Sequence, residues 1–153
     1  MKKRWLSVVC VMAILLSLSV INVRASEQMV DGSYLTNDTE SVGEAVLVMR
    51  GEDLQVGTSK VSKSSSTSIA AGGTTGAKHV VDEVGVVVIV ERLKVGTSSW
   101  LYYRTWENVK YDTAYVSSSK RLTVPTGYYY RVRCRHWANS DVSTSSTSGV
   151  LLD

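Results

Sequence analysis

The sequence predicts an all-β protein, an antiparallel β-sandwich of about eight short strands. Three observations predict this fold. Apolar and polar residues alternate with a period of two along several segments, turn-forming residues separate those segments, and no ten-residue stretch of the body has the period of a helix. The chain also contains one proline, Pro125, at a natural break between segments. A small closed β-barrel is the alternative, because short antiparallel strands can also close on themselves.

The first 25 residues have the features of a secretory signal peptide. Basic residues 2–4 precede an apolar run over residues 6–21, and Ala25 ends a plausible cleavage site. A membrane anchor is the alternative, but the apolar run is short and interrupted by serines. We therefore expect a secreted protein, cleaved after Ala25, with no membrane span afterwards. Cleavage leaves 128 of the 153 residues, enough for one domain with its own core.

The charge of the mature chain argues against nucleic acid as a partner. The chain has 17 basic and 14 acidic residues, but four of the basic ones lie within the signal segment, which leaves 13 against 14. A nearly neutral domain lacks the basic surface that binds a phosphate backbone. Acids are concentrated in an N-terminal arm, residues 26–44, and bases in residues 120–135. We expect the two segments to neutralise each other, with a basic patch for an anionic partner as the alternative.

The strands of the predicted sandwich occupy residues 45–153. The central one is 84–91, Val-Gly-Val-Val-Val-Ile-Val-Glu, which is apolar on both faces and is therefore expected to be covered on both. Residues 64–76 are predicted to be a polar strand with a bend at Gly72-Gly73. The other predicted strands are 45–49, 54–63, 100–107, 110–117, 120–124, 128–137 and 150–152.

Two octapeptides resemble each other. Residues 52–59 and 91–98 agree at six of eight positions, and each follows a predicted apolar strand. This pattern predicts a repeated strand–turn unit, with Gly57 and Gly96 at positions that need an unusual backbone angle. Duplication and chance both remain open, since one echo does not establish a repeat.

No catalytic residue, metal site or cofactor is predicted. The two histidines are His79, with Asp82 nearby, and His136, and the chain has no Gly-x-Ser-x-Gly motif. His136 shares one side of its predicted strand with Cys134, so we expect a packed core histidine. Two histidines and one mature cysteine do not form a zinc pattern. Cys134 has no partner for an internal disulfide and is expected to be a buried thiol.

The predicted binding face lies on one side of strand 128–137. Three arginines on one face are difficult to bury, and their forked donors bind carboxylate, sulfate or phosphate groups while aromatic neighbours stack. An anionic glycan or a cell-wall polymer is the expected ligand. The residues of this face are Tyr129, Arg131, Arg133, Arg135 and Trp137.

A second candidate surface is aromatic. Trp100, Tyr102 and Trp106 fall on one side of strand 100–107, where they could stack against sugar rings. Core packing is the alternative, because the chain has no phenylalanine and its tryptophans and tyrosines must supply large core side chains. For Trp106 the core is the expected place.

Several motifs also resemble a family of small secreted proteins of unknown function from Gram-positive, mostly gut-dwelling bacteria. They are Asp31-Gly-Ser-Tyr-Leu-Thr36, Glu40-Ser-Val-Gly43, Arg50-Gly51, the valine strand ending in Glu91, and Gly127-Tyr-Tyr-Tyr-Arg-Val132. The resemblance implies an exported single domain and transfers no site residue.

The leading functional hypothesis is a secreted, non-enzymatic binding module. A structural protein that self-associates or docks on a protein partner is the alternative, and an unrecognised hydrolase is the third possibility. The sequence does not predict an oligomeric state.

Overall fold

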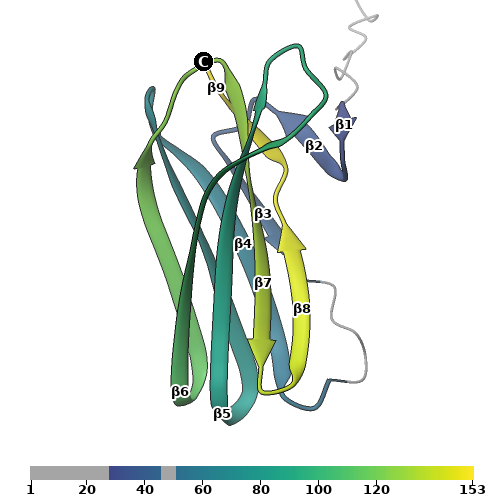
Figure 1. Cartoon of the computed structure of the whole chain (residues 1–153), viewed down its shortest axis with the longest axis vertical. Helices are drawn as coiled ribbons and strands as arrows, with labels where there is room; N and C mark the ends of the chain where they lie inside the picture. Colours follow the sequence, from purple (N-terminus) through teal and green to yellow (C-terminus); the bar gives the residue numbers. More distant parts are fainter. Residues whose placement is uncertain (1–27, 46–50) are drawn as a thin grey trace, which may run out of the picture.

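The computed structural model describes residues 28–45 and 51–153, which form nine strands and no helix (Figure 1). The all-β prediction is therefore confirmed. The predicted signal peptide and nearly all of the predicted strand 45–49 lie outside the described residues. No helix in the described part could cross a membrane. The strands are β1 (Met29–Val30), β2 (Ser33–Thr36), β3 (Glu40–Glu44), β4 (Leu54–Ser65), β5 (Ser68–Lys94), β6 (Leu101–Thr123), β7 (Tyr128–Ala138), β8 (Asp141–Ser146) and β9 (Gly149–Leu152).

A single curled sheet supplies both layers of the sandwich, because β5 and β6 pass from one layer to the other at its lower end (Figure 1). Residues 68–76 of β5 pair with 115–123 of β6, and residues 81–92 pair with 101–113, with a shift of register between the two blocks. The first half of β5 also pairs with β4, and the second half with β7.

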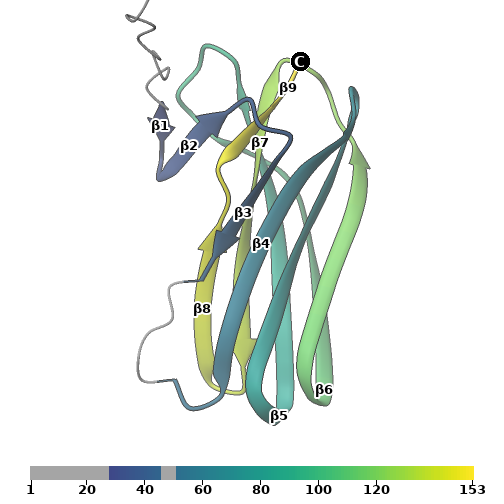
Figure 2. The ribbon, with the colours of Figure 1, turned by 180° about the vertical axis from the view of Figure 1, so that it is seen from behind.

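We name the two layers by these pairings. Layer A contains β3, β4, the first half of β5 and the second half of β6, and is in front in Figure 2. Layer B contains the first half of β6, the second half of β5, β7 and β8. The short strand β9 pairs with β7 at the upper end of layer B. The hairpin β1–β2 extends the sheet there, because β2 pairs in parallel with β9. The sheet is therefore mixed, rather than purely antiparallel as predicted.

The core lies between the layers. Val84, Val86, Val88 and Val90 of β5 are fully buried, and they face apolar side chains of β4 and the first half of β5. The opposite side of the same segment is only half-buried at Val87 and Ile89. The prediction that both faces of this segment are covered is therefore wrong at Val87 and Ile89. The β1–β2 hairpin covers only the upper part of layer B (Figure 1).

The predicted bend at Gly72-Gly73 is also wrong, because both glycines lie inside β5. Both positions need glycine because neighbouring atoms leave no room for a Cβ atom. A Cβ atom on Gly73 would lie 2.5 Å from Cys134 Sγ in the facing layer, and one on Gly72 would lie 2.6 Å from the Ser118 carbonyl oxygen. The chain changes layer a few residues later, between Gly76 and Val81, where the register shifts.

The echo between residues 52–59 and 91–98 has no common structure. Gly96 has a φ of +82° in the turn after β5, as predicted. Gly57 lies within β4 without a positive φ, and a Cβ atom there would lie 2.5 Å from the His136 ring. The two glycines therefore serve different purposes, one a turn and the other a close approach.

Candidate functional site

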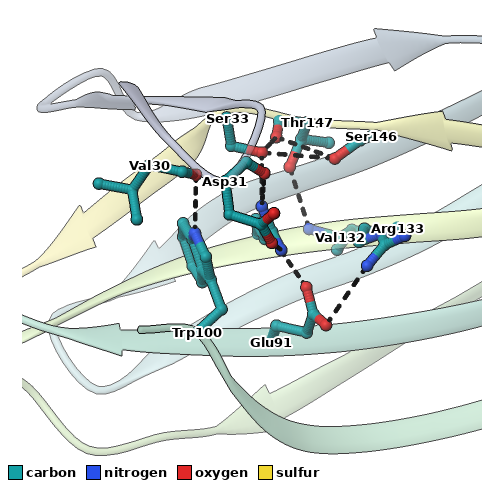
Figure 3. Close-up of polar contacts among 10 residues, drawn as sticks. Val30, Asp31, Ser33, Glu91, Trp100, Val132, Arg133, Ser146 and Thr147 are labelled. Carbon is teal, nitrogen blue, oxygen red and sulfur yellow. Dashed lines mark hydrogen bonds and ion pairs between the residues drawn. The ribbon is translucent and has the colours of Figure 1, made fainter. Parts of the chain in front are cut away.

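Arg131 lies on the outer side of β7, yet its side chain is only 2% exposed. Its guanidinium makes two ion pairs, Nε to Glu91 Oε2 at 2.7 Å and Nη2 to Asp31 Oδ2 at 2.8 Å. Nη1 donates hydrogen bonds to the Asp31 carbonyl oxygen at 2.8 Å and to Ser33 Oγ at 3.1 Å. These contacts attach the β1–β2 hairpin to layer B (Figure 3).

Trp100 completes the cover over Arg131. The guanidinium carbon lies 4.3 Å from the centroid of the indole ring, and Trp100 Nε1 donates a hydrogen bond to the Val30 carbonyl oxygen at 3.0 Å. The hydrogen bond and the charge of Arg131 hold the pKa of the Asp31 carboxyl below its usual value. At Arg131, acid and base neutralise each other as expected, and the residue is not part of an exposed binding face.

Arg133 and Arg135 are the exposed members of the predicted face. Arg133 has one distant ion pair, Nη1 to Glu91 Oε1 at 3.8 Å, and its side chain is 52% exposed. Arg135 has no ion pair or hydrogen bond with any described residue. Both arginines line an open depression of about 360 Å³. Its other lining residues are Glu44, Ile89, Cys134, Thr144, Ser145 and Ser146.

The aromatic members of that face lie elsewhere. Tyr129 lines a different hollow, between the β1–β2 hairpin and the 95–98 turn. Trp137 is half-buried, and its Nε1 donates a hydrogen bond to Glu83 Oε1 at 2.6 Å. The structure therefore brings together two of the five predicted residues, Arg133 and Arg135.

The second predicted face is divided as well. Trp106 is buried and donates a hydrogen bond from Nε1 to Ser118 Oγ at 3.0 Å, whereas Tyr102 is 63% exposed. Trp100 belongs to the cover over Arg131. A shift of register between Val90 and Glu91 inserts one extra residue into β6 near Tyr103, which reverses the alternation there. The expectation of a core position for Trp106 is confirmed.

Two exposed guanidinium groups beside a shallow depression form a surface that can hold the acidic groups of an extended ligand. No family model, curated protein or solved structure matches this chain. No cluster of three His, Cys, Asp or Glu side chains that could hold a metal ion occurs within 28–45 and 51–153.

The two histidines have unlike surroundings. His79, which the sequence places near Asp82, instead pairs with Asp53, Nε2 to Oδ1 at 2.9 Å, on the surface. His136 is fully buried, and its ring nitrogens lie 2.8 Å from Thr75 Oγ1 and 2.8 Å from Ser145 Oγ. Burial lowers the His136 pKa to about 4. The prediction of a packed core histidine is confirmed.

Cys134 gives a direct test of the packing between the layers. The thiol is buried, lies beside Gly73 and donates a weak hydrogen bond to the Gly72 carbonyl oxygen at 3.8 Å. Burial raises its pKa to about 12, so the nucleophilic thiolate is absent at neutral pH. In protein lacking residues 1–25, we expect no reaction with a thiol-specific chromogenic reagent at pH 8, and one equivalent of reaction after denaturation. Rapid labelling of the folded protein would contradict this packing.

Proposed function

We propose that the protein is an exported, non-enzymatic binding module that holds an anionic polymer, a glycan or a cell-wall polymer, at the depression beside Arg133 and Arg135. The observation that carries the proposal is the difference in ion pairing among the three arginines of β7. Arg131 is buried and neutralised, whereas Arg135 projects without a described partner and Arg133 has one at 3.8 Å.

The spacing of the two arginines suits a repeating ligand. Residues two apart on a strand point to the same side, about 7 Å from each other. Successive acidic groups of a linear polymer can therefore contact both guanidinium groups together. Thr144 lies on the next strand and is exposed, so its hydroxyl group can bond to neutral parts of the same ligand.

The rim of the depression favours acidic ligands with polar spacers over isolated small anions. Glu44 supplies one negative charge, and Ile89 supplies a small apolar surface. An exposed site of this kind binds through several weak contacts, and salt screens each of them. The signal peptide predicted from the sequence supports a location outside the cell, where such polymers occur.

The test is a pair of double variants. Changing Arg133 and Arg135 to serine is expected to weaken binding of polygalacturonate or teichoic acid at least tenfold, since each charged hydrogen bond contributes about 1.5–3 kcal/mol. Changing Arg104 and Arg121 to serine removes two exposed positive charges elsewhere and should leave the affinity nearly unchanged. Affinities are measured by calorimetry at two salt concentrations, with dextran as the neutral polymer. Equal affinity of the two double variants would remove the depression as the site.

A further inference from the structure

A second arginine site lies on the inner side of layer B, at the end of the sandwich near the C-terminus. Arg92 of β5 pairs in register with Tyr130 of β7. Its guanidinium carbon lies 5.1 Å from the centroid of the Tyr103 ring and 5.0 Å from that of the Tyr128 ring. Tyr130 contacts both rings, with centroids 5.9 Å and 6.3 Å away. The guanidinium is therefore held by aromatic rings from two other strands.

The charge of Arg92 has no carboxylate partner among the described residues. Its Nε atom is buried without a hydrogen-bond acceptor, the one such side-chain atom in the described part of the chain. Arg131, on the same pair of strands, has two carboxylates and no orphaned donor. A buried donor without an acceptor is costly, and such a group needs an explanation.

The tyrosines cannot neutralise this charge. The Tyr130 hydroxyl donates a hydrogen bond to the Pro125 carbonyl oxygen at 2.7 Å, and the Tyr103 hydroxyl donates one to the Thr123 carbonyl oxygen at 3.1 Å. Burial raises the Tyr130 pKa to about 12, so this phenol keeps its proton at physiological pH. The rings orient the guanidinium through cation–π contacts but supply no negative charge.

We propose that Arg92, whose guanidinium is held by Tyr103 and Tyr128, is an anion-binding residue that takes a carboxylate or sulfate group of a ligand on its Nη atoms at this end of the sandwich. The planar fork of a guanidinium matches a carboxylate in bidentate geometry. Because the tyrosine rings already restrict the side chain, binding costs less conformational entropy than at a free arginine. The site is separate from the Arg133 and Arg135 depression, which lies on the outer side of the same layer, and it does not depend on the function proposed there.

Nuclear magnetic resonance tests the proposal on the unmodified chain. The Nε–Hε resonance of Arg92, assigned by its loss in Arg92→Lys, is followed while acetate, sulfate or glucuronate replaces chloride at constant ionic strength. We expect a saturable shift at Arg92 and only a small linear drift at exposed Arg104. Tighter binding of glucuronate than of acetate would assign the carboxylate to an acidic sugar rather than to a free small anion. Equal linear drift at Arg92 and Arg104 would overturn the proposal.

Thermal unfolding provides the matched variants. Sulfate and glucuronate should raise the Tm of the wild-type protein and of Arg135→Gln to the same saturating extent. Arg92→Gln should lose this rise while remaining folded, because the substitution removes an unneutralised charge and an unpaired donor. An identical rise in Arg92→Gln would refute the assignment. If that variant does not fold, the resonance titration of the wild-type chain decides the question alone.

Discussion

Replacing Arg131 by methionine is expected to lower the free energy of unfolding by about 3 kcal/mol, the cost of breaking a buried ion pair by removing one partner. Arg131 is 2% exposed and has ion pairs with Glu91 and Asp31. Methionine preserves much of the contact with Trp100 but leaves Glu91, which is 17% exposed, with only the distant Arg133 at 3.8 Å. Urea unfolding followed by tryptophan fluorescence measures the change.

The matched control is Arg133→Met, on the same strand and two residues away. Its side chain is half exposed, so we expect a change within about 0.5 kcal/mol. Arg131→Lys should fall between the two, because an ammonium keeps the charge but cannot replace the forked contacts to Glu91, Asp31 and Ser33. A loss in Arg131→Met no larger than in Arg133→Met would show that the ion pairs do not stabilise the fold.

A double variant separates the two causes of the loss. Adding Glu91→Gln to Arg131→Met removes the carboxylate that the first substitution leaves unpaired, and part of the lost stability should return. The β1–β2 hairpin would still lack its attachment, because the bonds from Arg131 to Asp31 and Ser33 are gone. Limited proteolysis should therefore cut near residues 28–36 in both variants and not in Arg133→Met.

The strands that the sequence predicts best are those whose burial alternates locally. The predicted strands 54–63 and 128–137 correspond closely to β4 (Leu54–Ser65) and β7 (Tyr128–Ala138). In each, successive side chains point alternately toward the facing layer and away from it, so the pattern is visible within ten residues. β8 was missed because its inward positions, Ser143 and Ser145, are polar, and Ser145 bonds to His136 instead of packing among apolar groups.

The sequence did not predict β5 and β6 as single long strands. β6 spans three predicted strands, and β5 spans two, because both change layer without a proline or glycine turn at the crossing. The crossing of β5 lies between Gly76 and Val81, where the sequence is Ala-Lys-His-Val. Gly72-Gly73, which resembles a bend signal, instead leaves room for Cys134 and Ser118. Clearance from Cys134 in the facing layer and from Ser118 on the neighbouring strand is a tertiary requirement and has no local signature.

The candidate site shows the same limit. Arg131, Arg133 and Arg135 occupy equivalent positions in the alternation of β7, and nothing local distinguishes them. Arg131 differs because Asp31 and Ser33, about 100 residues earlier in the chain, fold over it. The uneven charge along the sequence was the one indication of this contact, since it predicts that the acidic arm meets the basic segment.

Acidification from pH 6.5 to pH 4 is expected to remove about 3 kcal/mol of stability through His136 alone. Burial lowers the His136 pKa to about 4, against an ordinary value of 6.5. Between these two pH values His136 is protonated in the unfolded chain but neutral in the folded chain, so acid favours unfolding. The contribution is complete above pH 6.5, declines by about 1.4 kcal/mol per pH unit below it and is lost near pH 4. Asp31 and Asp141, whose pKa values are lowered in the fold, weaken it further only below about pH 3.8.

The hydrogen bonds around His136 explain why its neutral form is required. The Thr75 hydroxyl has one proton, which it donates to the Gly85 carbonyl oxygen at 2.9 Å, so it must accept a hydrogen bond from His136 Nδ1. His136 Nε2 therefore carries no proton and accepts the hydroxyl proton of Ser145 at 2.8 Å. Protonating Nε2 turns the Ser145 hydroxyl from donor to acceptor in that bond, and it places a charge in a fully buried site that has no ion pair with a carboxylate of the described residues.

Urea unfolding at half-unit steps between pH 7 and pH 4 tests this account. His136→Asn should be less stable than the wild type at pH 7, because the asparagine side chain cannot reach both Thr75 and Ser145, but its stability should depend little on pH in this interval. His79→Gln, which removes the surface histidine, controls for the loss of a histidine as such and should keep the decline at low pH. A decline in His136→Asn as steep as in the wild type would place the acid sensitivity elsewhere in the chain. A flat profile in that variant alone would identify His136 as the group through which acid destabilises the contact between the two layers.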